Sequence, residues 1–70
     1  MTVAYSAKFE YGNAFKYFRF ETEIDPSYED RLGAALGEVD SIGKDSADSV
    51  EFFSRVPDAF SRHGFVRTAK

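Results

Sequence analysis

Apolar and polar residues alternate along residues 1–24, and the alternation is interrupted once, near Gly12. Before the interruption the apolar side chains fall at odd positions, and after it the apolar set falls at even positions. Alternation with period two is typical of a strand with one buried face. The pattern therefore predicts an N-terminal antiparallel β-hairpin. Its expected core-facing side chains are Val3, Tyr5, Phe9, Phe18, Phe20 and Ile24.

The parity of these positions restricts the connection between the two arms. Odd residues of the first arm must lie opposite even residues of the second, because a slip of one residue moves every side chain to the other face. A three-residue loop would pair Phe9 with Tyr17 and violate this condition. A two-residue Gly12-Asn13 turn, of a type favoured in hairpins, satisfies it. A four-residue loop over residues 12–15 does so as well, and the sequence leaves these two registers open.

The spacing of apolar residues becomes helical after Asp25-Pro26. An Asp side chain caps free helix amides, and Pro at the first helical position loses no hydrogen bond. The pattern predicts a helix over residues 26–39, followed by a polar linker over residues 40–46. Gly33 and Gly37 share one face, where we expect close packing on the hairpin or else a flat patch for a partner or a homodimer. The expected apolar stripe is Tyr28, Leu32, Ala35, Leu36 and Val39.

A second, shorter helix is predicted to begin at Asp48. Glu51 follows three residues later, as in a capping box. Pro57 is expected to stop or kink this helix, because it lacks an amide and clashes with the preceding turn. The apolar residues between them also fit a strand period, so residues 49–56 are open to either assignment.

The C-terminal residues predict a third strand. Gly64 is expected to close a helical turn in the left-handed conformation, and Phe65-Val66-Arg67-Thr68 then forms a short strand beside the hairpin. The expected fold class is α+β, with one or two helices packed on one face of the sheet.

The chain has 70 residues and no Cys. One domain spanning residues 1–70 is expected, and a domain of this size buries only about 60% of its unfolded surface. The absence of Cys excludes disulfides and thiolate metal sites. No apolar run approaches the roughly 20 residues of a membrane span, and no charged and apolar leader is present. We therefore expect a cytoplasmic protein without a membrane partner.

The net charge of −3 is distributed unevenly. Residues 1–20 carry +2, residues 21–51 carry −8 and residues 52–70 carry +3. Arg31 and Lys44 are the two cations of the acidic segment, against ten carboxylates. Segregation of charge bears on partners and association rates rather than on the fold.

Two ion-binding loop motifs are only partly matched by this sequence. Asp40 and Glu51 have the spacing of the first and last ligands of a calcium loop, but Ile42 and Lys44 stand at ligand positions and Asp45 replaces the required Gly. The same Asp45 replaces the magnesium-binding hydroxyl of a phosphate-binding loop. The sequence predicts neither a metal site nor a cofactor.

Catalysis is disfavoured by the residues available. His63 is the single histidine and precedes Gly64 at an expected helix end, where interaction with the helix dipole explains it. Nucleophilic catalysis needs a nucleophile, a base and an orienting group, and seven Ser among twelve acids give no specific combination. A chain this small cannot wall a deep cleft. The prediction is a protein that is not an enzyme.

The first functional hypothesis rests on the acidic segment. Its carboxylates would dock on a basic surface of a partner protein, including one that normally holds nucleic acid, since electrostatic complementarity selects partners and speeds encounter. This describes a protein-binding inhibitor or nucleic-acid mimic, analogous in size and charge alone to small acidic inhibitors of phages and thus to viral proteins. The predicted partner-binding residues are Glu21, Glu23, Asp25, Glu29, Asp30, Glu38, Asp40, Asp45 and Asp48.

The alternative hypothesis uses the outer face of the hairpin. Residues 15–20 interleave aromatic and basic side chains, an arrangement that stacks bases and holds phosphates in sheet-based modules. Over these six residues the pattern resembles the aromatic strand of RNA-recognition and cold-shock domains, but it lacks their Lys-Gly-Phe-Gly-Phe order. The net charge opposes phosphate binding, so nucleic acid is the less favoured partner. The residues of this alternative face are Lys8, Phe15, Tyr17 and Arg19.

Overall fold

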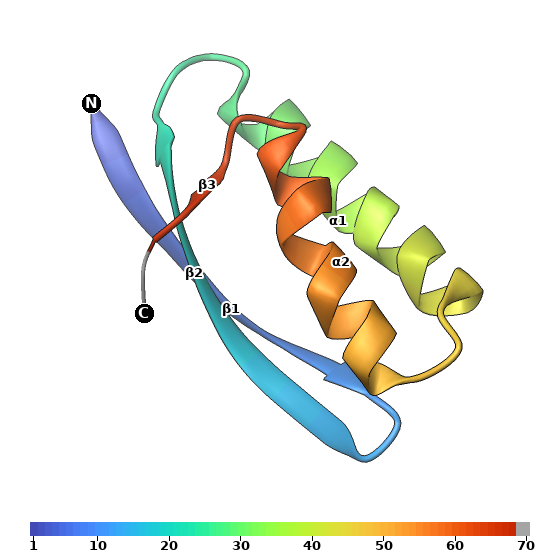
Figure 1. Cartoon of the computed structure of the whole chain (residues 1–70). Helices are drawn as coiled ribbons and strands as arrows, with labels where there is room; N and C mark the ends of the chain where they lie inside the picture. The colour runs from blue at the N-terminus through green and yellow to red at the C-terminus, as the bar shows by residue number, and fades with distance from the viewer. Residues whose placement is uncertain (69–70) are drawn as a thin grey trace.

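A computed structural model describes residues 1–68 of the chain. The strands β1 (Thr2–Tyr11), β2 (Ala14–Glu23) and β3 (Val66–Arg67) form one antiparallel sheet in the order β1-β2-β3. The helices α1 (Tyr28–Asp45) and α2 (Ser49–Ser61) connect β2 to β3 and both lie on the same face of the sheet (Figure 1). Among these described residues, the opposite face carries no helix. The prediction of an α+β fold with an N-terminal hairpin is confirmed.

The hairpin turn has two residues, Gly12 and Asn13. Tyr11 lies opposite Ala14, so the shorter of the two permitted connections is the one observed. Gly12 has a φ of 60°, a left-handed conformation that glycine adopts without steric cost and that this type of turn requires. The resulting register pairs Ala7 with Phe18, as the parity of the apolar positions demands.

The core-facing end of β2 differs from the expectation. Ile24 was expected in the core but is 45% exposed, because β2 ends at Glu23 and the chain turns away from the sheet. Thr22 occupies the last buried position of the strand instead. Its hydroxyl donates to the Gly64 carbonyl at 2.8 Å and accepts from Arg31 at 2.6 Å, so its burial leaves no unpaired oxygen.

Helix α1 begins later and ends later than the pattern predicted. Asp25 accepts the Ser27 amide at 2.9 Å and so forms a turn before the helix, which starts at Tyr28 and not at residue 26. The predicted linker over residues 40–46 is wrong, since α1 continues to Asp45. Ile42 is buried and extends the apolar stripe by one turn, which favours helix over loop.

Helix α2 confirms the capping signal and removes the strand alternative. The Asp48 carboxylate accepts the Glu51 amide at 2.9 Å, and the Glu51 carboxylate accepts the Ala47 amide at 3.1 Å. The expected stop at Pro57 is wrong, because the helix continues to Ser61. Burial of Phe60 beyond the proline offsets the roughly 3 kcal/mol that a proline costs inside a helix.

The chain leaves α2 through Gly64 and returns to the sheet. Gly64 has a φ of 83°, and the Phe65 amide donates to the Phe60 carbonyl at 3.0 Å, which closes the helix as predicted. β3 then pairs with β2, and the Thr68 amide donates to the Arg19 carbonyl at 3.0 Å. The predicted third strand is confirmed, although only two of its four residues are in the ladder.

The core lies between β2 and the two helices. Aromatic rings dominate it, and Phe20 stacks on Phe60 with ring centres 4.4 Å apart. Neither α1 nor α2, the helices found within residues 1–68, is long and apolar enough to cross a membrane. The buried apolar residues are Phe18, Phe20, Ala35, Val39, Ile42, Phe52, Val56, Ala59, Phe60 and Phe65.

The two glycines in the middle of α1 are not close-packing positions. A Cβ atom built on Gly33 or Gly37 would meet no other atom within 4 Å, so the expected packing against the hairpin aromatics is wrong. The helix turns Ala35 and Val39 to the core instead, which leaves both glycines on the outer side. A homodimer through this glycine face stays a prediction.

Replacing Gly33 or Gly37 with Ala should therefore stabilise the fold. Each change should raise the free energy of unfolding by about 0.5–1 kcal/mol, because Ala lowers the entropy of the unfolded chain and no atom stands in its way. Urea unfolding followed by circular dichroism measures this. Gly64→Ala is the control with the opposite sign, since its Cβ would lie 2.9 Å from the Arg31 guanidinium and its φ is positive.

Candidate functional site

Within residues 1–68 no helix covers the face of the sheet turned away from α1 and α2 (Figure 1). We call it the open face. Because side chains alternate along a strand, it is formed by the even residues of β1, the odd residues of β2 and one residue of β3. Its side chains are all exposed: Thr2, Ala4, Ser6, Lys8, Glu10, Phe15, Tyr17, Arg19, Glu21, Glu23 and Val66.

Two aromatic rings stand together on the open face. Phe15 is 59% exposed and Tyr17 is 69% exposed, and their ring centres are 5.9 Å apart in an edge-to-face arrangement. The Lys8 ammonium lies 5.3 Å from the centre of the Phe15 ring, and Lys8 is directly opposite Tyr17 in the hairpin. Arg19 follows Tyr17 on the same face. The structure thus brings together all four residues of the alternative sequence hypothesis.

Three cations of β2 and β3 have no carboxylate partner, and of these only Arg19 lies on the open face. Among residues 1–68, Lys16, Arg19 and Arg67 form no ion pair, whereas every other Lys and Arg there forms one. The Arg67 guanidinium lies 5.1 Å from the centre of the Phe18 ring, and the Lys16 ammonium lies 5.5 Å from it. The unpaired positive charge of the described chain is therefore concentrated around the middle of β2.

A shallow depression marks the same region. It has a volume of about 370 Å³ and lies where β3 meets β2. Its lining joins an open-face aromatic, two of the unpaired cations and small polar groups: Ser6, Tyr17, Phe18, Arg19, Arg67 and Thr68.

The acidic residues of the first hypothesis are spread over β2, α1 and the segments before and after α1. Six of the nine contact other groups within the chain. Asp40 pairs with Lys44 at 3.5 Å, and Asp45 pairs with Arg55 at 3.1 Å. The others so engaged are Glu23, Asp25, Glu38 and Asp48. Within residues 1–68 the side chains without such a contact are Glu21, Glu29 and Asp30.

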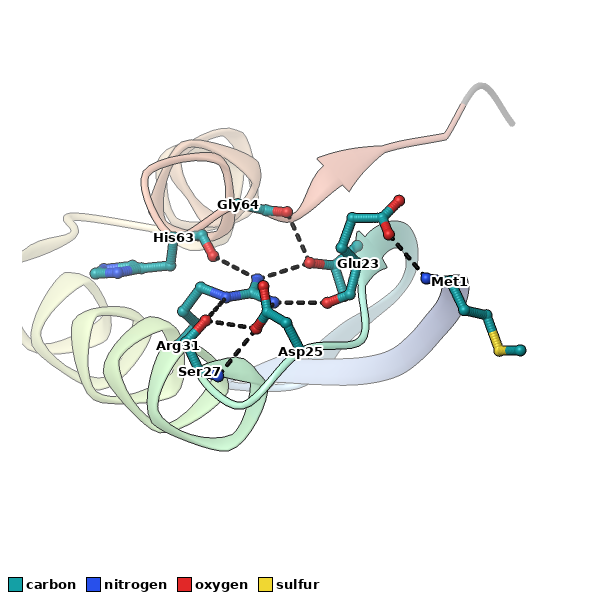
Figure 2. A network of polar contacts seen from close by, with 8 residues as sticks. Met1, Glu23, Asp25, Ser27, Arg31, His63 and Gly64 are labelled. Atoms are coloured by element: carbon teal, nitrogen blue, oxygen red, sulfur yellow. Dashed lines mark hydrogen bonds and ion pairs between the residues drawn. The ribbon is translucent and has the colours of Figure 1, made fainter.

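Arg31 is the residue that sequence reasoning missed. Figure 2 shows its guanidinium between the end of β2, the start of α1 and the turn after α2. It donates to the carbonyls of Glu23 at 2.7 Å and His63 at 3.0 Å, and to the Ser27 hydroxyl at 2.8 Å. It also pairs with Asp25 at 3.4 Å. The signal in the sequence was its position, one of two cations in a strongly acidic segment.

This network gives Glu23 and Asp25 structural roles. Asp25 holds the turn before α1, and its contacts with Ser27 and Arg31 lower the pKa of its carboxyl. The Glu23 carboxylate accepts hydrogen bonds from the Thr2 hydroxyl and the Met1 amino group, which lower its pKa (Figure 2). Both carboxylates are thus engaged within the fold.

Glu38 joins α1 to the end of α2. Its carboxylate contacts the Arg62 guanidinium and lies 2.7 Å from Nε2 of His63. These two contacts lower the pKa of Glu38 below its ordinary value of 4.5. His63 contacts this carboxylate, and its interaction with the helix dipole stays a prediction.

Acid should weaken the contact between Glu38 and Arg62. Since the pKa of Glu38 is lower in the folded state, its contribution to stability is complete above about pH 4.5 and is lost as the pH falls through the folded value. Glu38→Gln should lower the melting temperature at pH 6. It should also reduce the difference in melting temperature between pH 6 and pH 3. Thermal unfolding at both pH values measures this. If the melting temperature fell equally between pH 6 and pH 3 in the wild type and in Glu38→Gln, this would contradict the prediction. Asp58→Asn, on the exposed side of α2, is the control.

The buried polar groups of the described residues are engaged within the fold. Within residues 1–68, no group of three or more His, Cys, Asp or Glu side chains could hold a metal ion. No buried side-chain nitrogen or oxygen of the described residues lacks a hydrogen-bond partner. The side chains of residues 1–68 with unused binding capacity are therefore exposed ones: the aromatics Phe15 and Tyr17, the unpaired cations, and the carboxylates Glu21, Glu29 and Asp30.

No family model, curated protein or solved structure matches this chain.

Proposed function

We propose that this chain is a non-enzymatic protein-binding module that docks through its open face. The partner surface would present apolar side chains to Phe15 and Tyr17 and a carboxylate to Arg19. The observation that carries the proposal is the coincidence, on the uncovered side of the sheet, of two exposed aromatic rings with Arg19 unpaired beside them.

Composition supports protein recognition at this surface. Tyr, Phe and Arg are enriched in protein interfaces, and Tyr and Arg recur among the residues that contribute most of the binding free energy. Val66 adds an exposed aliphatic side chain from β3. Arg19 defines the complementary charge, since a carboxylate of a partner would neutralise a guanidinium that finds no ion-pair partner within residues 1–68.

The acidic segment offers less support for a docking surface. A nucleic-acid mimic needs a dense array of unpaired carboxylates on one side, and Glu38, Asp40 and Asp45 are each paired within the fold. Docking of the acidic segment on a basic partner stays a prediction, as do a cytoplasmic location and the absence of enzymatic activity. Of the two sequence hypotheses, the geometry favours the residues of the hairpin.

Single-stranded nucleic acid is the competing occupant of the open face. Bases stack on exposed aromatic rings, but proteins that bind single-stranded nucleic acid combine these rings with a positively charged groove. Here Lys8 is neutralised by Glu10 at 3.3 Å, and Glu21 lies on the same face. Few cations are therefore free to hold phosphates, which favours a protein partner.

Affinity capture with matched variants tests the proposal. The wild-type protein, a Tyr17→Ala/Arg19→Ala variant and a Glu29→Lys/Asp30→Lys variant are each immobilised and exposed to the same lysate, with and without nuclease. We expect a protein captured by the wild type and the α1 variant but at least ~30-fold more weakly by the open-face variant. Circular dichroism confirms that all three are folded.

Three outcomes would overturn the proposal. Capture lost in the α1 variant and kept in the open-face variant would transfer binding to the acidic residues. Capture abolished by nuclease, together with binding of a fluorescent single-stranded oligonucleotide that depends on Tyr17, would identify nucleic acid as the partner. Capture indifferent to both variants would place binding elsewhere on the molecule.

A further inference from the structure

β1 is an edge strand of unusual length for a fold of this size. It has 10 residues, lies outside β2 in the sheet, and contains neither Pro nor Gly. Its pairing with β2 is uninterrupted, so no bulge bends it. Lys8 and Glu10 are its two charges and neutralise each other at 3.3 Å. Of the devices by which proteins protect an exposed edge, short length, proline and bulges are absent from β1, and its two charged side chains pair with each other.

The hydrogen-bonding pattern of the hairpin determines which amides and carbonyls of β1 point away from β2. The Ile24 amide donates to the Met1 carbonyl at 2.8 Å, so these two residues form a hydrogen-bonded pair. In antiparallel sheets such pairs alternate with pairs that are not hydrogen-bonded. The odd residues of β1 therefore direct their amides and carbonyls at β2. The even residues direct theirs outward at the free edge: Thr2, Ala4, Ser6, Lys8 and Glu10.

The side chains of β1 that face the helices are incompletely covered. Phe9 contacts the rings of Phe18 and Phe60, yet Phe9 and Tyr11 are only half-buried. A shallow hollow of about 260 Å³ opens beside them, between the end of β1 and α1. Another strand added outside β1 would extend the covered apolar surface on this side of the sheet.

We propose that β1 pairs with β1 of a second copy of this chain. The two strands run antiparallel around a two-fold axis at Ala7, which joins both sheets into one. This register pairs Tyr5 with Phe9 of the second copy, an aromatic pair of the kind that stabilises sheets. It keeps the helices of both copies on one side, because residues of the same parity lie opposite each other.

Charge supports a second copy as the occupant. In this register Lys8 lies opposite Ser6 and Glu10 lies opposite Ala4, so no like charges meet across the axis. Registers centred on Lys8 or Glu10 would place each charge opposite itself, which is destabilising. The dimer is independent of the proposed partner on the open face, and each proposal can fail without the other.

Amide hydrogen exchange of the full chain tests the pairing directly. Sedimentation equilibrium should give twice the monomer mass of 7.9 kDa at high protein concentration. Exchange at the outward amides of Ala4, Ser6 and Lys8 should slow at least ~10-fold as the dimer forms, because only pairing outside β1 protects them. The amides of Ala7 and Phe9 should be protected at every concentration, since they bond to β2.

Two variants separate edge pairing from other modes of association. Ser6→Pro removes an outward amide without removing a bond to β2, and should give a folded monomer. Ser6→Lys places a positive charge opposite Lys8 of the second copy and should have the same effect. Ser61→Lys, at an exposed position of α2, is the control that should remain dimeric.

Three results would overturn edge pairing. The first is a wild-type protein that sediments as a monomer up to about 1 mM. A dissociation constant of that value corresponds to a binding free energy of only about 4 kcal/mol. The second is a dimer in which Ala4, Ser6 and Lys8 exchange as fast as in the monomer. The third is a dimer that survives Ser6→Lys but is lost in Gly37→Glu, which would place the interface on α1.

Discussion

Replacing Phe60 with Ala is expected to lower the free energy of unfolding by about 3–5 kcal/mol. Phe60 is fully buried and stacks on Phe20, and its ring also meets Tyr5, Phe9 and Phe65. It therefore joins both strands of the hairpin to the segment that follows α2. A domain of 70 residues has a total stability of about 4–10 kcal/mol. The substitution removes a large part of it, and urea unfolding followed by circular dichroism measures the loss.

Val50→Ala is the control for this prediction. Val50 lies on the same helix but is 77% exposed, so its truncation should change stability by less than about 0.5 kcal/mol. A Phe60→Ala variant within about 1 kcal/mol of the wild type would contradict the assignment of Phe60 to the centre of the core.

Replacing Arg31 with Ala is expected to lower the free energy of unfolding by about 2–3 kcal/mol. The side chain is 20% exposed, and its guanidinium bridges Thr22, the Glu23 carbonyl and the His63 carbonyl. The substitution leaves the buried Thr22 hydroxyl without its donor and removes the tie between β2 and the turn after α2. Urea unfolding measures the change in free energy.

Arg31→Lys distinguishes geometry from charge. A lysine keeps the positive charge near Asp25 but cannot reproduce the fork that donates to several acceptors at once. We expect it to recover less than half of the lost stability. Full recovery would mean that the charge alone matters and that the hydrogen bonds to the two carbonyls contribute little.

The hairpin was the most predictable part of the fold. Alternation with period two fixed which side chains face the helices, and parity reduced the connection to two alternatives. The choice between them depends on the backbone at Gly12, which the pattern does not report. The one error, Ile24, arose because an apolar residue with the right parity continued past the point where β2 ends.

Helix boundaries were less predictable because tertiary burial overrides local signals. Gly43 and the polar residues around it indicated a linker, but burial of Ile42 keeps them helical. Pro57 indicated an end to the second helix, but burial of Ala59 and Phe60 carries the helix past it. In both cases the decisive contact lies on another element, and no local window of sequence contains it.

The candidate site was predictable as two sets of residues but not as a choice between them. The sequence identified Tyr17 and Arg19 as one surface and the acidic segment as another. It could not show which charges pair within the fold, because the partner of Asp45 lies on α2 and the partners of Glu38 lie just after it. Arg31 was missed for the same reason, since its acceptors come from three separate segments.

The pairing of β3 with β2 has a consequence for the order of folding. The hairpin is local and should form early, whereas Phe20 and Arg67 meet only after both helices have formed between them. A two-residue strand held at its end by the Thr68 amide should be the last element to dock and the first to open. Val66, the β3 residue of the open face, reaches the sheet at that step. The complete docking surface would then exist only on fully folded molecules, and a partner that requires it would discriminate against folding intermediates.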